Sequence, residues 1–513
     1  MAKSTTPSFI TTIPLVVTSQ SESELLSRFQ AGRQLYNALL NEAMVRMRLV
    51  KKSEQYQLAI KLPKGKTRTE AFAIARKQHR YSDYDIQAYG TVVANDSKWI
   101  AQKVDSNTQQ KLATRTFQAS EKVMFGRAKK VRFKVPSRFR SMEGKTNKQG
   151  IRWTGGQLVW GKLKLNALID KNNPVMMYGL NSEVKYVRIL WKEIHGKRRW
   201  YAQLINKGEP YQKAANFVSH GVVGIDINIS NVAYVADNNA GLLPFAQNVP
   251  TFEREICAIQ RKMQRSVRQS NPDRYEPDSF QKKGHKTVIK KGNPKKGYRQ
   301  GNKSKRYQKL AAKKRELERR KSEYAKSQNR RLVNQILRQG NQIKTEKVSV
   351  KGWQKNWGKA ISAKSPGFFQ SELKRKAEKA GGSFYQFSTP KTALSQTHLT
   401  GERIKKSLSE RVHYDKSGVV MHRDLMSAFF SRHVYDDKLS LQDAQSEYPG
   451  LETTLLRAWQ QYQQSANRVS VSESQCCHSP VELIRSDKEK SSQIASERTG
   501  DKLDISFLGI SRF

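Results

Sequence analysis

The chain has 513 residues, which is long enough for a sizeable core and for roughly three or four domains of about 150 residues each. It contains 95 Lys and Arg residues against 44 Asp and Glu residues, so its formal net charge is +51. Such a charge repels itself unless a polyanion neutralises it. The composition therefore argues against an enzyme for small neutral substrates, and it favours nucleic acid over a membrane surface as the partner.

Other protein classes also fit the sequence poorly. No run of about 18 apolar residues occurs, so we expect no transmembrane helix. The apolar stretch at residues 10–17 is short and interrupted by Pro14, and it favours a strand over a signal peptide. The cysteines, Cys257, Cys476 and Cys477, cannot form a disulfide framework, so we expect a reducing compartment.

The N-terminal part of the chain divides into a strand, a helical region and a β-rich region. After a strand-like start, Ser21 and Glu24 form a capping-box pattern, and apolar residues then recur at helical spacing. We predict a helical domain at residues 21–127 and a small barrel or sandwich at residues 128–218. The strand candidates are residues 150–153, 157–160, 184–191 and 200–205. Because we expect the first strand to join them, the helical domain is an insertion.

Basic and aromatic residues alternate in the β-rich region. Rings stand between or beside cations in Arg132-Phe133-Lys134, Arg138-Phe139-Arg140 and Arg152-Trp153. This mixture suits phosphate contacts combined with base stacking, and the alternative is an ordinary β-domain with a basic outer face. The residues predicted to contact nucleic acid here are Arg132, Lys134, Arg138 and Arg140.

A long basic segment lies further along the chain. Residues 281–330 hold 20 Lys and Arg against 3 Glu, an excess of 17 positive charges. We interpret its first part, rich in Gly, Lys and Gln, as a flexible loop and residues 303–337 as a helix. A charge run is usually a solvated face, but this excess favours docking on an RNA or DNA backbone. The predicted contact residues are Lys305, Arg306, Lys313, Lys314, Arg319 and Arg320.

The sequence then alternates short apolar strands and helices before ending in a polar tail. Residues 467–513 are rich in Ser, Glu, Gln and Lys, and we expect most of them to be disordered. Cys476, Cys477 and His478 in this tail look like a metal cluster. No fourth ligand lies nearby, so we expect no zinc there.

Three acidic residues stand out by their context. Asp226 lies on one face of an otherwise apolar strand, where a carboxylate is costly unless it pairs or binds a metal. It could instead start the turn that follows. Glu346 lies at another strand and could be an ordinary surface residue. Asp424 lies where a strand enters a helix and could be the N-cap of that helix.

These residues resemble the RuvC-type nuclease domain of TnpB proteins and type V CRISPR effectors. Those families carry a Gly-Ile-Asp strand, a Glu followed by a Val-Lys-Gly-like turn, and an Arg-Asp pair followed by small residues on a helix. The matching residues here are Gly224-Ile225-Asp226, Glu346 with Val350-Lys351-Gly352, and Arg423-Asp424 with Ser427-Ala428. The resemblance covers most of residues 8–465.

The resemblance implies a multidomain α/β and α+β fold, with an RNase H-like (RuvC) nuclease domain, a β-barrel wedge domain and a helical recognition domain. Residues 1–20 and 128–218 would form the wedge-like barrel, and residues 21–127 the recognition domain. Residues 219–466 would form the nuclease domain. Within it lie a basic helical insertion at residues 252–337 and a target-loading subdomain at about residues 388–418.

Several positions depart from the family pattern. The family often has two Cys-x-x-Cys pairs before its third acidic residue, and this chain has none there. His398 and His413 alone cannot make a four-ligand zinc site, so we expect a degenerate subdomain without zinc. Met426 replaces a usual Asn, His422 a frequent acidic residue and Asn228 a common Gly. The carboxylates are retained, but their surroundings are altered.

By resemblance, we expect an RNA-guided DNA endonuclease of the prokaryotic cytoplasm, associated with the nucleoid when bound to DNA. Its partners would be a guide RNA and target double-stranded DNA, with no membrane partner and an open oligomeric state. Asp226, Glu346 and Asp424 would be catalytic and hold Mg²⁺ or Mn²⁺, with Asp226 bridging two ions roughly 4 Å apart.

Two other functions stay open at this point. The first is a nuclease-deficient RNA-guided DNA-binding protein that acts in repression or transposon targeting. The second is a transposase or RNA-processing nuclease that uses no guide.

Overall fold

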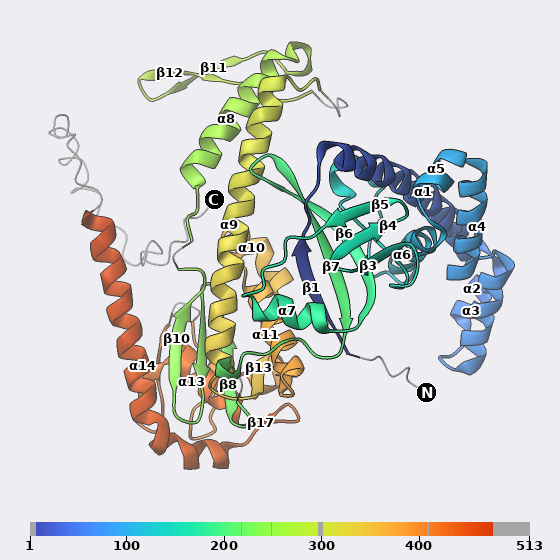
Figure 1. Cartoon of the computed structure of the whole chain (residues 1–513). Helices are drawn as coiled ribbons and strands as arrows, with labels where there is room; N and C mark the ends of the chain where they lie inside the picture. The colour runs from blue at the N-terminus through green and yellow to red at the C-terminus, as the bar shows by residue number, and fades with distance from the viewer. Residues whose placement is uncertain (1–6, 217, 248, 296–300, 408–409, 476–513) are drawn as a thin grey trace. The chain divides into compact units, whose positions relative to one another are not determined.

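The computed structural model describes residues 7–216, 218–247, 249–295, 301–407 and 410–475. The chain is a mixed α/β protein that divides into two compact units, Met1–Tyr211 and Gln212–Phe513 (Figure 1). None of the helices among the described residues is both long and apolar enough to cross a lipid bilayer.

The first unit contains two antiparallel sheets. The four-stranded sheet has the order β1-β7-β6-β2, with β1 (Ser8–Pro14), β7 (Lys197–Lys207), β6 (Val184–Ile194) and β2 (Ser141–Glu143). The three-stranded sheet has β3 (Ile151–Thr154), β4 (Gln157–Trp160) and β5 (Leu163–Asn166). Because β1 pairs along its length with β7, the N-terminal strand joins the β-rich region and the helices between β1 and β2 are an insertion, as predicted.

The inserted helices share one hydrophobic core with these sheets. They are α1 (Ser19–Lys52), α2 (Glu54–Lys61), α3 (Lys66–Gln78), α4 (Asp83–Asp96), α5 (Lys98–Lys103) and α6 (Ser106–Met124), while α7 (Pro174–Asn181) precedes β6. Leu25, Phe29 and Leu35 of α1 lie in the same buried cluster as Trp200 of β7. The helix starts before the predicted cap, because Thr18 is the N-cap and Ser21 completes the capping box.

The second unit is built on a five-stranded mixed sheet of order β10-β9-β8-β13-β14. Its strands are β8 (Val222–Ile227), β9 (Asn231–Val235), β10 (Ala240–Pro244), β13 (Gln342–Glu346) and β14 (Ser383–Phe387). The strands β8, β13 and β14 run parallel, whereas β9 and β10 form an antiparallel extension from β8.

Helices cover both faces of this sheet. On one face, Val223 and Ile225 pack with residues of α9 (Lys305–Leu337) and α11 (Pro366–Lys379). On the other, Ala233 and Val235 pack with residues of α13 (Arg423–Arg432) and α14 (Leu441–Gln475). Smaller elements connect these layers: α10 (Val350–Lys364), α12 (Thr389–Thr392), β15 (Val412–Tyr414), β16 (Val420–His422), β17 (Val434–Tyr435) and β18 (Lys438–Leu439).

The basic segment contains more regular structure than predicted. After α8 (Glu253–Gln269), the strands β11 (Ser279–Lys283) and β12 (Lys286–Lys290) form an antiparallel hairpin, so the flexible-loop prediction is wrong for these residues. Gly284 in the turn has φ +63°, a conformation that glycine adopts without strain. The predicted helix at 303–337 is confirmed as α9, with Ser304 as its N-cap.

The C-terminal end of the described chain is helical. α14 extends to Gln475, which is nine residues into the segment that we predicted as a tail from residue 467. The remaining predicted tail, including Cys476, Cys477 and His478, lies outside the described residues.

Candidate nuclease site

The three predicted carboxylates converge at one edge of the five-stranded sheet. Asp226 is the penultimate residue of β8, Glu346 ends β13, and Asp424 lies in the first turn of α13. β8 and β13 are adjacent and parallel, so their carboxyl ends reach the same edge. All three side chains line one cavity of about 340 Å³.

Gly224 explains how α13 comes close enough to bring Asp424 beside Asp226. A Cβ atom on Gly224 would lie 2.1 Å from the carbonyl oxygen of Ala428, so only glycine permits this packing of α13 on β8. Arg432, at the end of α13, fixes the contact because its Nη1 donates to the Val222 carbonyl at 2.7 Å. The Gly-Ile-Asp pattern therefore has a packing reason in addition to its carboxylate.

The site concentrates negative charge in a poorly solvated place. Burial, followed by the charges of Asp424 and Glu346, raises the pKa of Asp226 well above its ordinary value. Burial also raises the pKa of Glu346. Asp424 is only 2% exposed, and its Oδ2 is buried without a hydrogen-bond partner among the described residues. Buried unpaired carboxylates of this kind call for a cation.

Two guanidinium groups lie near the same oxygen of Asp424. The Nη1 of Arg411 lies 3.8 Å and the Nε of Arg423 lies 3.7 Å from Oδ1 of Asp424. These contacts are longer than hydrogen bonds and leave Oδ2 untouched. Both arginines lower the pKa of Asp226, but burial and the two carboxylates outweigh them.

The structure overturns the simpler interpretations of Asp424 and Glu346 and retains part of the one for Asp226. Asp424 is not the N-cap, because His422 occupies that position and its Nδ1 accepts from the Asp424 amide at 3.2 Å. Glu346 is a partly buried cavity residue and not an ordinary surface residue. Asp226 also contacts the following turn, since the Asn228 side chain donates to its Oδ2 at 3.3 Å.

Sequence reasoning missed several polar residues of the cavity. Thr389, Ser427 and Lys406 line it together with the carboxylates. Ser427 follows Asp424 by one helical turn, so helical spacing could have placed it on the same face. Thr389 and Lys406 come from the connections after β14, and no local pattern in the sequence points to them.

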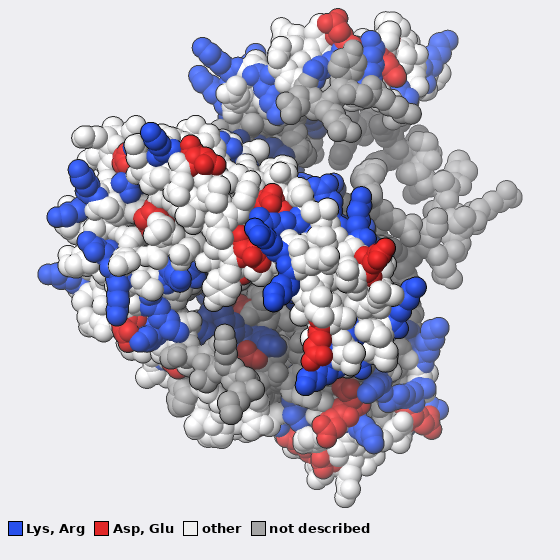
Figure 2. Space-filling view, turned by 90° about the vertical axis from the view of Figure 1, so that its right-hand side faces the viewer, with Lys and Arg blue, Asp and Glu red and all other residues white. Residues whose placement is uncertain are grey.

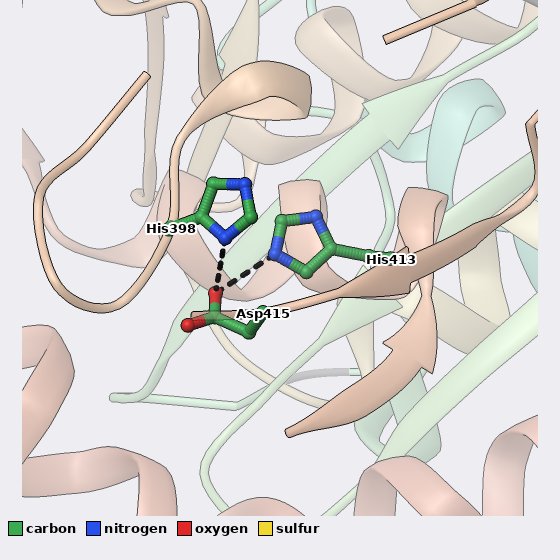
Figure 3. Close-up of side chains that lie close together, drawn as sticks. All are labelled: His398, His413 and Asp415. Carbon is green, nitrogen blue, oxygen red and sulfur yellow. Dashed lines mark hydrogen bonds and ion pairs between the residues drawn. The ribbon is translucent and has the colours of Figure 1, made fainter. Parts of the chain in front are cut away.

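A second polar cluster lies in the predicted zinc-free subdomain. Among the described residues, one group of three potential metal ligands has all its ligand atoms within 4.8 Å of one another. Its members are His398, His413 and Asp415. Figure 3 shows both imidazole rings directed at one carboxylate oxygen of Asp415. Nε2 of His413 lies 2.8 Å and Nδ1 of His398 lies 3.6 Å from Oδ2. The two histidines were candidate ligands here from the sequence, whereas Asp415 was not.

The predicted nucleic-acid residues of the first unit lie before β2. Arg132 and Arg138 are exposed, and the Arg140 guanidinium lies 4.9 Å from the Trp191 ring centroid. Lys134 is held by Asn37, which exchanges two hydrogen bonds with its backbone. The stacking interpretation is wrong for Phe139, which is only 3% exposed and packs in the core.

The predicted contact residues on α9 fall into two groups. Lys305, Arg306 and Lys313 are exposed, whereas Lys314 and Arg319 pair with glutamates one turn away on the same helix. The Arg320 guanidinium lies 5.1 Å from the Phe252 ring centroid. Lys and Arg outnumber Asp and Glu on the face shown in Figure 2, in agreement with the net charge.

Comparison with known proteins gives no family assignment. No family model matches the chain, and no curated protein matches it. One similar solved structure is titled "Cryo-EM structure of the Cas12f1-sgRNA-target DNA complex", with a TM-score of 0.38, 8% identity, and coverage of 82% of this chain and 98% of that chain. Another is titled "Cryo-EM structure of CRISPR-Cas12f Ternary Complex", with a TM-score of 0.29, 11% identity and coverage of 82% of both chains. Both TM-scores lie below 0.5, so neither match assigns a fold or a function.

Proposed function

We propose that the protein is an RNA-guided DNA endonuclease that binds a guide RNA and cuts target DNA at the carboxylate cavity. The observation that carries this proposal is the convergence of Asp226, Glu346 and Asp424 from β8, β13 and α13 on one cavity. We assign the five-stranded sheet with its two helical layers to an RNase H-like domain of the RuvC type, and the two sheets of the first unit to the wedge.

The residues of the cavity fit a hard divalent cation such as Mg²⁺ or Mn²⁺. The three acidic side chains supply oxygen donors, which these ions prefer. Oδ2 of Asp424 is buried and unpartnered among the described residues, and Asp226 is the carboxylate on which the charges of both others act. A bound cation would relieve this repulsion. We therefore assign Asp226, Glu346 and Asp424 as the metal ligands.

Three carboxylates on rigid elements suit the hydrolysis of a phosphodiester. Divalent ions held by Asp226, Glu346 and Asp424 would supply an activated water and stabilise the departing oxygen. The chain contributes three ligands held on two strands and one helix, and rigid elements of this kind fix a site better than loops do. The cavity is part of the second unit only, so one domain carries the hydrolytic chemistry.

The charge of the chain supports nucleic acid as guide and target. A net charge of +51 suits polyanionic partners, and the exposed Lys305, Arg306 and Lys313 on α9 suit backbone contacts. The sequence resemblance to TnpB proteins and type V CRISPR effectors supports guidance by RNA. In such systems base pairing supplies the specificity, and the protein holds the heteroduplex by its backbone.

The test is to purify the protein from its native locus and sequence the RNA that accompanies it. We expect one discrete species with a constant scaffold and a variable segment. A plasmid that carries the matching target should then be cut in Mg²⁺ by the wild type and not by Asp226→Ala. A smear of ribosomal and transfer RNA would contradict guidance, and cleavage that persists in a chelator would contradict the metal site.

A nuclease-deficient RNA-guided DNA-binding protein is the second candidate. The contacts of Arg411 and Arg423 with Asp424 favour it, because guanidinium groups supply positive charge where a metal would bind. This candidate predicts specific target binding with a verified guide, no cleavage in Mg²⁺, and the same target affinity for the wild type and Asp226→Ala.

A further inference from the structure

Lys406 is one of two lysines that line the carboxylate cavity, the other being Lys347, and neither has an assigned role so far. Lys406 lines the cavity together with Asp226, Glu346 and Asp424, and it is partly exposed. The chain beside it is anchored, because Nη1 of Arg423 donates to the Ser407 carbonyl at 3.0 Å. Among the described residues, no ion pair joins Lys406 to any of these three carboxylates, and the acidic groups that act on its charge are Asp415 and Glu410.

His413 fixes the direction of the Lys406 side chain. Nζ of Lys406 lies 2.6 Å from Nδ1 of His413. An ammonium group can only donate, so Nδ1 accepts and the proton of the imidazole resides on Nε2. Burial lowers the pKa of His413, which agrees with a neutral ring. Only one of the three N–H bonds of Lys406 is used in this contact.

Asp415 in turn fixes His413. Nε2 of His413 donates to Oδ2 of Asp415 at 2.8 Å, and the two side chains are 1% and 0% exposed. The other donors to Asp415 are the Leu399 amide, the Ser417 amide and the Ser417 hydroxyl. The carboxylate is therefore held on all sides, and it orients the imidazole as an aspartate does in other relay sites.

The same hydrogen bonds argue against a metal ion in this cluster. A metal would need the lone pairs of His398, His413 and Asp415. Nδ1 of His398 already accepts from the Lys416 amide at 3.0 Å, and Nδ1 of His413 accepts from Lys406. The nitrogen of His413 that faces Asp415 carries the proton. The cluster of Figure 3 is therefore a hydrogen-bonded support.

We propose that Lys406 is a further catalytic residue that binds the phosphodiester of the nucleic-acid strand entering the cavity, and that His413 and Asp415 are positioning residues that act through it. The proposal rests on the proposed function. Three carboxylates repel an anionic phosphodiester, and a fixed ammonium group offsets this repulsion at the reacting phosphate. A cation held before the substrate arrives needs little reorganisation during the reaction.

The first test is lysine footprinting, which needs no cleavage. The full chain is treated with an amine-acylating reagent, with and without an oligothymidine single strand in a chelating buffer, and acylation is read by mass spectrometry. We expect the strand to slow acylation of Lys406 about fivefold, because a phosphate occupies its free N–H bonds. The neighbouring Lys405 is exposed and outside the cavity, and it serves as the matched control. Equal rates at Lys406 with and without the strand would overturn the proposal.

The second test is kinetic and separates positioning from structural support. Lys406→Met keeps the stem and removes the charge, and we expect its kcat to fall about 10²-fold with little change in KM, as for other lost transition-state donors. Lys406→Arg should restore part of the rate. His413→Phe should lower kcat less, and the double variant should be no slower than Lys406→Met alone, because both changes act through one ammonium group. Additive losses would overturn the positioning role.

The outcomes distinguish this proposal from the proposed function. If the wild type cuts nothing with a verified guide, the nuclease function fails, while the footprint still decides whether Lys406 contacts a phosphate. If the wild type cuts and Lys406→Met cuts equally well, the role of Lys406 fails alone. One tightly bound zinc per purified chain, lost in His413→Phe, would also overturn the proposal, because the lone pair that orients Lys406 would belong to the metal.

Discussion

The two units differ in what they bury. In the described part of the first unit, the buried polar side chains are Thr, Ser and Asn, and none is an Asp, Glu, His, Lys or Arg. The second unit buries Asp424, Asp415, Arg432 and several histidines. Buried charges cost stability unless their partners are well placed. The first unit is therefore organised as an apolar scaffold, and the second concentrates titratable side chains in its interior.

Asp226→Asn should have the largest effect. We expect a loss of cleavage of at least about 10³-fold, because the variant removes a proposed metal ligand. The pKa of Asp226 is raised in the folded state, so its ionised form costs stability at neutral pH. The variant should therefore melt at a higher temperature than the wild type in a chelator. A lower melting temperature there would contradict a net cost of the ionised Asp226, whether from burial or from the neighbouring carboxylates.

Two glycine variants compare how closely a helix packs on its neighbours in each unit. Gly224→Ala would push a Cβ to 2.1 Å from the backbone of α13, and we expect it to cost about 3 kcal/mol or more and to disrupt the site. In Gly32→Ala of α1 the new Cβ would lie closer than ordinary contact only to the flexible end of the Met142 side chain, at 2.6 Å, so the cost should be about 1 kcal/mol or less. Urea denaturation measures both, and Gly358→Ala, with no neighbour within 4 Å, is the control. Equal costs for the two variants would contradict the account of α13 packing.

Mild acid should weaken the second unit first. Burial lowers the pKa of His398 and His413 from the ordinary 6.5. Below pH 6.5 the unfolded chain therefore binds protons that the folded chain does not. The free energy of unfolding is therefore highest above pH 6.5. It falls as the pH drops toward the lowered pKa values of these histidines, by up to about 1.4 kcal/mol per pH unit for each histidine. Hydrogen exchange at pH 7.5 and 5.5, corrected for the intrinsic rate, should show the loss around β15. Earlier loss of protection in the first unit would contradict this.

The smallest effects should come from the surface of α9. A triple variant with Lys305, Arg306 and Lys313 changed to Ala should bind RNA with a weaker salt dependence. We expect the slope of log affinity against log salt to become less negative by about 2, since each lost phosphate contact removes roughly 0.7 to 0.9 from the magnitude of this slope. Lys314→Ala should change it less, because Lys314 already pairs with Glu318 at 3.1 Å. Filter binding over a range of salt concentrations measures the slopes. An unchanged slope in the triple variant would remove α9 from the nucleic-acid interface.

The features that could be predicted from the sequence are those that short segments of the chain encode. Strands β1, β3, β4, β6 and β7 and helix α9 were predicted from alternation and charge, and short motifs singled out the three carboxylates, whereas β2, β5 and the β11–β12 hairpin were not predicted. The sharing of one core by the inserted helices and the sheets was not, because it depends on long-range packing such as that of Phe29 on Trp200. Lys406 reaches His413 through loop geometry, which no spacing in the sequence reveals, whereas the i, i+2 spacing of His413 and Asp415 at β15 could have placed these two side chains on one face.

The most direct test of the central claim is a calorimetric titration of Mn²⁺ into the full chain without nucleic acid. We predict binding that is lost or strongly weakened in Asp226→Asn, Glu346→Gln and Asp424→Asn, and retained in Asp436→Asn, an exposed acidic residue outside the cavity. Mn²⁺ binding that is unchanged in all three variants, or absent from the wild type, would contradict the assignment of these carboxylates as a metal-dependent nuclease site.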